Sequence, residues 1–218
     1  MDGLPLAVAL VAGAYLSGSI PMGVIVARVS GGPDPRTIGS GRTGGTNALR
    51  ALGRRWAAVV VIGDVLKGAL PVLIARAVEA GPAIEVLCGL AAVLGASWSI
   101  FLGLRGGRGV GAGVGTMLVI QPVAVALAAP VFVIVILLTR YVSLGSLLGS
   151  AAMAGWTWLF WMAANGALSV AYPLYTAAGA ALVWLAHADN IDRLVHGRER
   201  KFDLTLLGRD TPGGPASG

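Results

Sequence analysis

The sequence predicts an all-α protein that crosses a membrane several times. Of its 218 residues, 56% are hydrophobic and only 12% are charged, which is about half the charged fraction of soluble domains. The mean hydropathy is +0.80, and the apolar residues fall into long runs. Because 10 acidic and 16 basic residues cannot cover a soluble globule of this size, and disordered chains are poor in apolar residues, both of those classes are excluded.

Several apolar stretches are candidates for membrane-spanning helices. A bilayer core of about 30 Å needs about 20 apolar residues of helix. The longer stretches comprise residues 4–26, 56–75, 83–102, 123–138, 144–163 and 168–186. Residues 110–120 form a shorter stretch, which would rise only about 16 Å as a helix and is followed by Gln121 and Pro122.

The basic residues decide whether this short stretch counts as a span. With seven spans and the N-terminus outside, 14 of the 16 basic residues face the cytoplasm, as the positive-inside rule requires. With six spans, Arg140 and the basic tail would move outside. We therefore predict seven transmembrane helices and a cytoplasmic C-terminus, with residues 110–120 as a half-length or tilted helix. The 14 residues are Arg28, Arg36, Arg42, Arg50, Arg54, Arg55, Arg105, Arg108, Arg140, Arg193, Arg198, Arg200, Lys201 and Arg209.

We expect one integral membrane domain over residues 1–210 and a flexible tail over residues 211–218. The first apolar run is not typical of a cleaved signal peptide, because no Lys or Arg precedes it and it is longer than a usual h-region. Cys88 is the single cysteine, and the histidines and carboxylates lack metal-ligand spacing. Basic residues do not alternate with aromatic ones as in nucleic-acid binding. We expect no metal, cofactor or nucleic-acid partner.

The first glycine-rich segment follows the first span. Glycines let successive backbone N–H groups turn inward around an anion, and hydroxyl, amide and guanidinium groups add donors. No Gly-Lys-Ser/Thr follows, so the segment is not a Walker A loop. A phosphate cradle and a flexible interfacial loop explain this composition equally well. The segment comprises Gly39, Ser40, Gly41, Arg42, Thr43, Gly44, Gly45, Thr46, Asn47 and Arg50.

The second glycine-rich segment opens the short stretch at residues 110–120. Cations and free N–H groups at a helix N-terminus favour an anion. We slightly favour a phosphate site over a basic connector, although Gly111 and Gly115 form a small-xxx-small pair that is typical of helix packing. The segment comprises Arg105, Gly106, Gly107, Arg108 and Gly109.

Polar residues after the last span form a third segment. His187, Asn190 and Arg193 are spaced by three, so they share one helical face. A His in this company binds a phosphate or accepts a proton, whereas an amphipathic interfacial tail with an incidental His is the more common arrangement on spacing alone.

Asp64 and Lys67 lie one turn apart inside the second predicted span. Ionisable residues at membrane depth are costly and are usually functional or paired. We favour an ion pair that locks the helix bundle, and Lys67 bordering a polar site is the alternative.

Together these segments resemble the PlsY family, the acyl-phosphate:glycerol-3-phosphate acyltransferases of bacterial membranes. The resemblance covers nearly the whole chain in family order, and the predicted seven-span topology agrees with it. The matching residues are Gly18, Ser19, Ile20, Pro21, Gly23, Asp34 and Arg36, then Gly39, Ser40, Gly41, Thr46, Asn47 and Arg50, then Asp64, Lys67 and Gly68, then Phe101, Leu102 and residues 105–110, and last His187, Asn190, Ile191, Arg193, Leu194, Gly197, Glu199 and Lys201.

The resemblance implies transfer of a fatty acyl group from acyl phosphate to the 1-hydroxyl of glycerol 3-phosphate. The products would be lysophosphatidic acid and inorganic phosphate, in a step of phospholipid biosynthesis. It further implies a bacterial inner (plasma) membrane location among membrane lipids, with the active site facing the cytoplasm and no cofactor. The sequence leaves the oligomeric state open, with a monomer among the options.

We hypothesise a division of the site between the two substrates. Residues 39–47 would chiefly hold the phosphate of the acyl phosphate. His187 would orient or deprotonate the attacking hydroxyl, unless a substrate phosphate accepts that proton. The residues expected around glycerol 3-phosphate are Ser40, Arg50, Arg105, Arg108, His187 and Asn190, and those expected to support the site are Asp34, Arg36, Asp64, Lys67, Arg193 and Glu199.

The chain departs from the family pattern at a few positions. Ala96 follows Gly95 where the family usually has His, Arg42 stands for a usual Asn, and Arg105 and Arg108 stand for usual lysines. These changes leave a catalytically weak paralogue, or a non-catalytic lipid-binding subunit, as alternatives. A transporter for a phosphorylated metabolite is the alternative from another class, but such proteins often show internal repeats, and none is evident here.

Overall fold

The computed structural model describes residues 3–208, and its regular secondary structure there is helical throughout. Arg209 and the predicted flexible tail at residues 211–218 lie outside the described residues. The α-helices are α1 (Leu4–Ser19), α2 (Met22–Ser30), α3 (Gly45–Leu52), α4 (Arg54–Ala77), α5 (Pro82–Ser97), α6 (Val110–Ile120), α7 (Pro122–Thr139), α8 (Val142–Ala163), α9 (Ala171–Ala186) and α10 (Ala188–Val195), and the 3-10 helices are η1 (Pro35–Thr37), η2 (Ile100–Leu102) and η3 (Leu204–Gly208).

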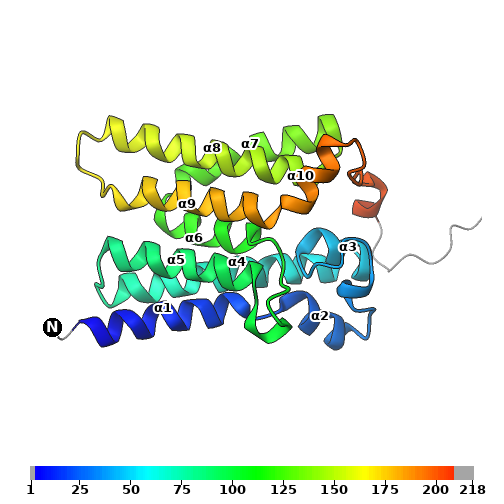
Figure 1. The fold of residues 1–218 in the computed structure, drawn as a ribbon, viewed down its shortest axis with the longest axis horizontal. Helices are drawn as coiled ribbons and strands as arrows, with labels where there is room; N and C mark the ends of the chain where they lie inside the picture. The colour runs from blue at the N-terminus through cyan, green and yellow to red at the C-terminus, as the bar shows by residue number, and fades with distance from the viewer. Residues whose placement is uncertain (1–2, 209–218) are drawn as a thin grey trace, which may run out of the picture.

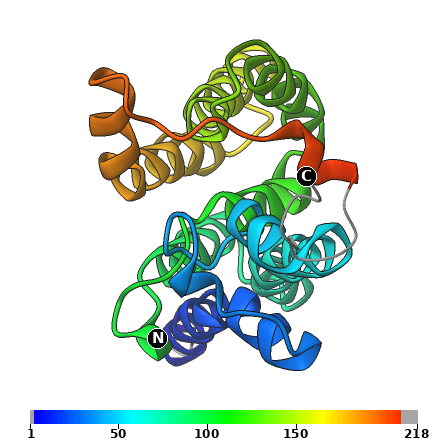
Figure 2. The ribbon, with the colours of Figure 1, turned by 90° about the vertical axis from the view of Figure 1, so that its right-hand side faces the viewer.

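The long helices form two layers, as the view along the bundle shows (Figure 2). One layer contains α1, α4, α5 and α6, and the other contains α7, α8 and α9, with α5 and α6 contacting α9 across the two. Helices α2, α3 and α10 lie at one end of the bundle, opposite the N-terminus (Figure 1). We call this end the polar end, because the segments that carry most of the basic residues meet there.

Within residues 3–208, three helices are individually long and apolar enough to span a membrane, namely α4, α5 with η2, and α7. The bent pair of α1 and α2 counts as a fourth, while α6 and α9 are apolar but shorter. The predicted short stretch at residues 110–120 is a helix of its own, and α7 starts immediately after Gln121. The prediction of a separate half-length helix is therefore confirmed.

The first predicted span is not one continuous helix, which corrects the prediction for residues 4–26. It breaks between α1 and α2 with a bend of 43°, because Pro21 has no backbone N–H to continue the helix. Lys67 Nζ donates to the carbonyl of Ile20 at 3.1 Å and lies 2.7 Å from Asp64 Oδ1. The predicted ion pair is thus confirmed, and it also satisfies a backbone carbonyl that the break leaves without a helical partner.

Glycines bring the helices of the first layer into close contact. A Cβ at Gly115 on α6 would lie 2.0 Å from the carbonyl oxygen of Val65 on α4, and one at Gly18 on α1 would lie 2.1 Å from the carbonyl oxygen of Ala92 on α5. Gly111 likewise packs against Asp64. The helix-packing interpretation of Gly111 and Gly115 is confirmed, because no larger residue fits at this backbone separation.

Candidate active site

A polar cavity of about 360 Å³ lies at the polar end. Its walls come from the first glycine-rich segment with α3, from α4, from the start of α6, from α7 and α8, and from α10 with the chain that follows it. It brings together many residues of all three predicted segments. These residues are Ser40, Arg42, Gly44, Gly45, Thr46, Asn47, Arg50, Arg108, Gly109, His187, Asn190 and Glu199.

The buried side chain of Asn47 shapes the first segment. Its Oδ1 accepts from the backbone N–H of Ser40 at 3.2 Å, and its Nδ2 lies 2.6–3.0 Å from three carbonyl oxygens. Gly39 and Gly41 adopt positive φ values of 56° and 68°, which glycine accepts most readily. The side-chain N–H groups of Asn47 are therefore used in hydrogen bonds that hold the loop in place. The three carbonyls belong to Pro35, Ile38 and Arg42.

The rest of the first segment keeps its donors available. The backbone of Gly44–Thr46 forms the N-terminus of α3 at the cavity wall, where N–H groups have no helical acceptor. Arg42 and Arg50 are partly buried, and neither makes an ion pair with another residue in the described range. Burial lowers the pKa of both guanidinium groups. Partly buried positive charge without a carboxylate partner favours a bound anion.

The second segment uses its donors within the protein. The N–H groups of Gly106 and Gly107 donate to the carbonyls of Ser97 and Ala96 at the end of α5, at 3.1 and 2.8 Å. Arg108 donates to both carboxylate oxygens of Asp189 at 2.7 and 3.0 Å and to the carbonyl of Ala186 at 2.8 Å. Only Arg108 and Gly109 of this segment line the polar cavity.

Asp189 is the carboxylate that holds Arg108 in place. Burial opposes ionisation of Asp189, but the hydrogen bond and charge of Arg108, together with the charges of Arg193 and Arg42, hold its pKa well below the usual range. Asp189 therefore stays ionised, and it joins the second segment to α10.

His187 is buried between α9 and α10, and its ring is fixed by one hydrogen bond. Its Nδ1 lies 2.7 Å from the carbonyl oxygen of Val183. Because a carbonyl only accepts, Nδ1 carries the proton and Nε2 is the unprotonated acceptor. Burial lowers the pKa of His187 to about 4. The side chain is thus neutral at pH 7, and it lines the polar cavity.

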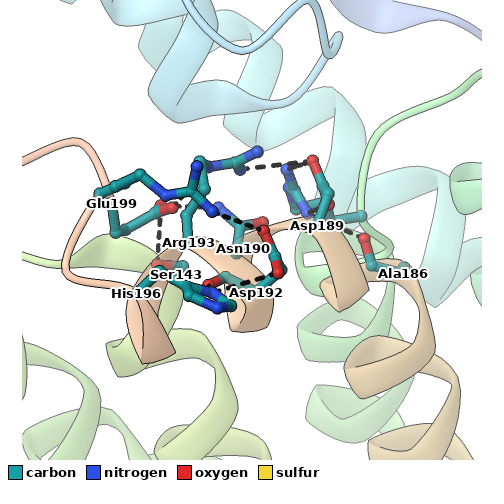
Figure 3. A network of polar contacts seen from close by, with 10 residues as sticks. Ser143, Ala186, Asp189, Asn190, Asp192, Arg193, His196 and Glu199 are labelled. Carbon is teal, nitrogen blue, oxygen red and sulfur yellow. Dashed lines mark hydrogen bonds and ion pairs between the residues drawn. The ribbon is translucent and has the colours of Figure 1, made fainter.

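Glu199 is the centre of a polar network beside α10 (Figure 3). Its carboxylate accepts from Asn190 Nδ2 at 2.6 Å, from Ser143 Oγ at 3.0 Å and from Arg193 Nε at 2.8 Å. Because Nδ2 faces this carboxylate, the amide orientation of Asn190 is fixed. Its Oδ1 is buried and has no hydrogen-bond donor among the residues that the structure describes, and an unpaired buried acceptor calls for a bound donor.

Several residues that the sequence placed in the site lie outside the cavity walls. Asp34 and Arg36 form an ion pair at 2.6 Å on the exposed outer face of the loop. Arg105 is exposed, and Thr43 is buried beneath the loop. The predicted site residues that do not line the polar cavity are Asp34, Arg36, Gly39, Gly41, Thr43, Asp64, Lys67, Arg105, Gly106, Gly107 and Arg193.

Sequence reasoning missed Asp189 and Ser143. Asp189 lies four residues before Arg193 on α10 and contacts it at 3.3 Å, so the helical spacing of opposite charges was an available signal. Ser143 and Ser146 both line the cavity, and their spacing of three residues near the start of an apolar helix marks one polar face.

Ala96, which replaces a usual family His, is buried and does not line the polar cavity. It packs with Val93 and Ala112, and its carbonyl accepts from Gly107. The departure therefore falls behind the second segment rather than among the groups that face the cavity.

A second, apolar cavity of about 180 Å³ adjoins the polar one between the two helix layers. Four residues line both cavities: Val110, Val114, Phe132 and Ser146. From there the apolar cavity continues along α6, α7, α8 and α9. A polar, arginine-lined space thus lies directly beside an apolar one, an arrangement that suits a molecule with a charged head and a hydrocarbon chain.

Known proteins with similar sequences and folds agree on one family. The family model described as glycerol-3-phosphate acyltransferase matches residues 8–197. The chain is 41% identical over 200 residues to a glycerol-3-phosphate acyltransferase of Desulforudis audaxviator, covering 91% of this chain and 98% of that one. It is 43% identical over 195 residues to one of Myxococcus xanthus, covering 89% and 98%.

Two crystal structures of PlsY, an integral membrane glycerol 3-phosphate acyltransferase, have the same fold. The glycerol 3-phosphate form matches with a TM-score of 0.82 at 35% identity, over 93% of this chain and 99% of that one. The lysophosphatidic acid form matches with a TM-score of 0.81 over the same fractions. With the family model matched over residues 8–197 and relatives above 40% identical over about nine-tenths of its length, the chain belongs to the PlsY family of integral membrane glycerol-3-phosphate acyltransferases.

Proposed function

We propose that this acyltransferase uses acyl phosphate as its donor and acylates the 1-hydroxyl of glycerol 3-phosphate. The single observation that supports this most is the junction of the two cavities at Val110, Val114, Phe132 and Ser146. A fatty acyl phosphate placed across the junction has its phosphate among the arginines and its chain among apolar side chains. The carbonyl carbon that reacts then lies beside His187 and Asn190.

The donor phosphate binds at the first segment. The N-terminus of α3 at Gly44–Thr46 offers backbone N–H groups, and Arg42 adds a guanidinium charge that is not in an ion pair with any residue that the structure describes. An acyl phosphate is an activated anhydride with a good leaving group. Stabilising the departing phosphate and positioning the two substrates are therefore sufficient, and no covalent acyl-enzyme is needed.

Glycerol 3-phosphate binds on the other side of the cavity. Arg50 and Ser40 hold its phosphate together with Arg108, which Asp189 orients. Asn190 Oδ1 accepts from a hydroxyl of the glycerol, which supplies the donor that this buried oxygen lacks. Nε2 of His187 accepts from the 1-hydroxyl and directs its oxygen toward the acyl carbonyl.

The reaction is a direct displacement at the acyl carbon. The hydroxyl oxygen forms the ester bond, and the bond between the acyl carbon and the phosphate oxygen breaks. The hydroxyl proton passes to the departing phosphate, either directly or through Nε2 of His187. The products are 1-acylglycerol 3-phosphate and inorganic phosphate, and no oxidant or metal takes part in the balance.

We further propose one membrane domain of seven spans with the N-terminus outside and the polar end in the cytoplasm of a bacterial cell. The support is the positive-inside rule and the position of α3 and α10 at the end opposite the N-terminus (Figure 1). This orientation opens the cavity toward the compartment that supplies glycerol 3-phosphate.

The donor is tested with purified protein, palmitoyl phosphate and a phosphate-release assay. We expect release that depends on glycerol 3-phosphate, with lysophosphatidic acid formed in equal amount. A parallel reaction contains a palmitoyl thioester as the donor. Acylation with the thioester but not with palmitoyl phosphate would overturn the donor assignment while leaving the acyltransferase family intact.

A further inference from the structure

The apolar cavity has a definite far end. Met117 on α6, Val125 on α7, Met153 on α8 and Tyr175 on α9 line it there. All four belong to, or pack against, the hydrophobic cluster that fills the bundle beyond. Tyr175 is fixed because its hydroxyl hydrogen-bonds with Thr116 in the buried interior. We call Met117, Met153 and Tyr175 the floor of the cavity.

The distance from the reacting groups to this floor is set by α9. His187 follows α9 directly, and Tyr175 lies twelve positions earlier, which corresponds to about 18 Å of helix. A zigzag hydrocarbon chain advances about 1.3 Å per carbon–carbon bond. The distance along α9 between the reacting groups and the floor therefore corresponds to a chain of about 14 bonds.

Gly179 lies on the wall between these two points. It lines the cavity, and a Cβ built on it has only the ring of Tyr175 in contact, at 4.0 Å. A larger side chain at this position therefore extends into the cavity rather than into a neighbouring helix. Gly179 is eight positions before His187, so the block would lie about 12 Å from the reacting groups, which corresponds to about nine bonds.

We propose that the apolar cavity measures the acyl chain, with Met117, Met153 and Tyr175 as the floor and Gly179 as the open wall that admits chains longer than about ten carbons. The proposal rests on the proposed function, because it takes the occupant to be the acyl chain of the donor and of the product. Continuity with the polar cavity through Val110 and Val114 is what selects this occupant over a bulk membrane lipid.

The test compares Gly179→Leu with Gly155→Leu. Gly155 also lies within a helix of the second layer, but it is exposed and a Cβ there has no neighbour within 4 Å, so it is the matched control. The measurements are kcat/KM with acyl phosphates of 8 to 18 carbons, and the binding affinity for lysophosphatidic acids of 10 and 16 carbons. The binding measurement does not depend on the identity of the donor.

Gly179→Leu should lower the ratio of activity with 16 carbons to that with 10 carbons at least about tenfold, and binding should shift in the same direction. Gly155→Leu should keep the original profile. Met153→Ala, which deepens the floor, should move the optimum two to three carbons longer, and it serves as the second test if Gly179→Leu does not fold.

An unchanged chain-length ratio in Gly179→Leu, or in Met153→Ala where the first variant is unfolded, would overturn the proposal. Inactivity of the wild-type protein with every acyl phosphate would instead refute the proposed donor. In that case the lysophosphatidic acid affinities still decide whether this cavity measures the chain.

Discussion

The two glycine- and arginine-rich segments at the polar end look alike in sequence, but the structure uses them differently. In the first, Asn47 binds the loop carbonyls, and within the described residues the first N–H groups of α3 and the side chains of Arg42 and Arg50 make no hydrogen bond or ion pair. In the second, Gly106 and Gly107 close the end of α5, and Arg108 is paired with Asp189.

This difference shows that glycine and arginine content identifies a candidate anion site. It does not distinguish a loop that binds a phosphate from a basic loop that only connects two helices. What distinguishes the two is whether each N–H or guanidinium group is already hydrogen-bonded to an acceptor within the protein. A backbone N–H that already donates to a carbonyl cannot also hold a phosphate with full strength. The first segment therefore keeps donors available for the proposed phosphate site, whereas the second segment positions Arg108 and is bonded to the end of α5.

The largest effect should come from removing an unpaired arginine of the first segment. Arg50→Gln should lower kcat/KM for glycerol 3-phosphate about 100-fold, mainly through KM, because a charge-assisted contact to the substrate phosphate is lost. Arg105→Gln, in the second segment, should change it less than about threefold, because Arg105 is exposed and lies outside the cavity. Equal losses in steady-state kinetics would erase the distinction between the two segments.

A smaller effect should follow from releasing Arg108 from its carboxylate. Asp189→Asn should lower kcat/KM about tenfold, because Arg108 loses the bidentate partner that sets its orientation. Asp192→Asn is the matched control on the same helix, since the ion pairs that Asp192 makes within the described residues are with exposed His196 and Arg198. If Asp189→Asn raised the affinity for glycerol 3-phosphate, the carboxylate would be competing with the substrate rather than positioning Arg108.

The same substitution should affect stability in one segment and activity in the other. A Cβ at Gly106 would lie 2.5 Å from the carbonyl oxygen of Ala96, so Gly106→Ala should destabilise the fold by about 1–3 kcal/mol. A Cβ at Gly44 has no neighbour within 4 Å, so Gly44→Ala should cost no more than about 1 kcal/mol and should instead raise KM for the acyl phosphate. Melting temperatures in detergent and steady-state kinetics measure the two effects, and a reversed pattern would contradict the assignment.

The smallest expected effect concerns pH. His187 has a pKa of about 4 in the folded protein and about 6.5 when unfolded. Between these values the unfolded chain binds more protons, so stability is complete above pH 6.5 and falls as the pH drops toward 4. From pH 7 to pH 5 this group should cost about 2 kcal/mol. Thermal unfolding at both pH values should show this loss in the wild type, and His187→Gln should remove it. An equal loss in that variant would assign the dependence to other groups.

The sequence was sufficient for the parts of the fold that depend on apolar length and on paired charges at membrane depth. The predicted helix over residues 110–120 has the observed bounds, and the Asp64–Lys67 pair forms as expected. The break at Pro21 was missed because the apolar run continues through it, so hydropathy alone does not reveal it. The span predicted over residues 83–102 matches the candidate span Pro82–Leu102, in which α5 ends at Ser97 and η2 follows.

The site was predictable at the level of segments but not of individual donors. Ser40, Arg50, Arg108, His187 and Asn190 do meet around one cavity. The partners that decide their roles are tertiary, such as Asp189 for Arg108 and Glu199 for Asn190. These pairings depend on where α10 and the chain after it lie at the polar end, and no local pattern encodes that position.

The most direct test of the account is a structure of the protein with a non-hydrolysable long-chain acyl phosphonate. The account predicts the phosphonate at the N-terminus of α3 beside Arg42, with the chain passing Val110 and Phe132 toward Tyr175. A phosphonate held by the backbone of residues 105–107, or a chain that leaves between helices without entering the apolar cavity, would contradict it.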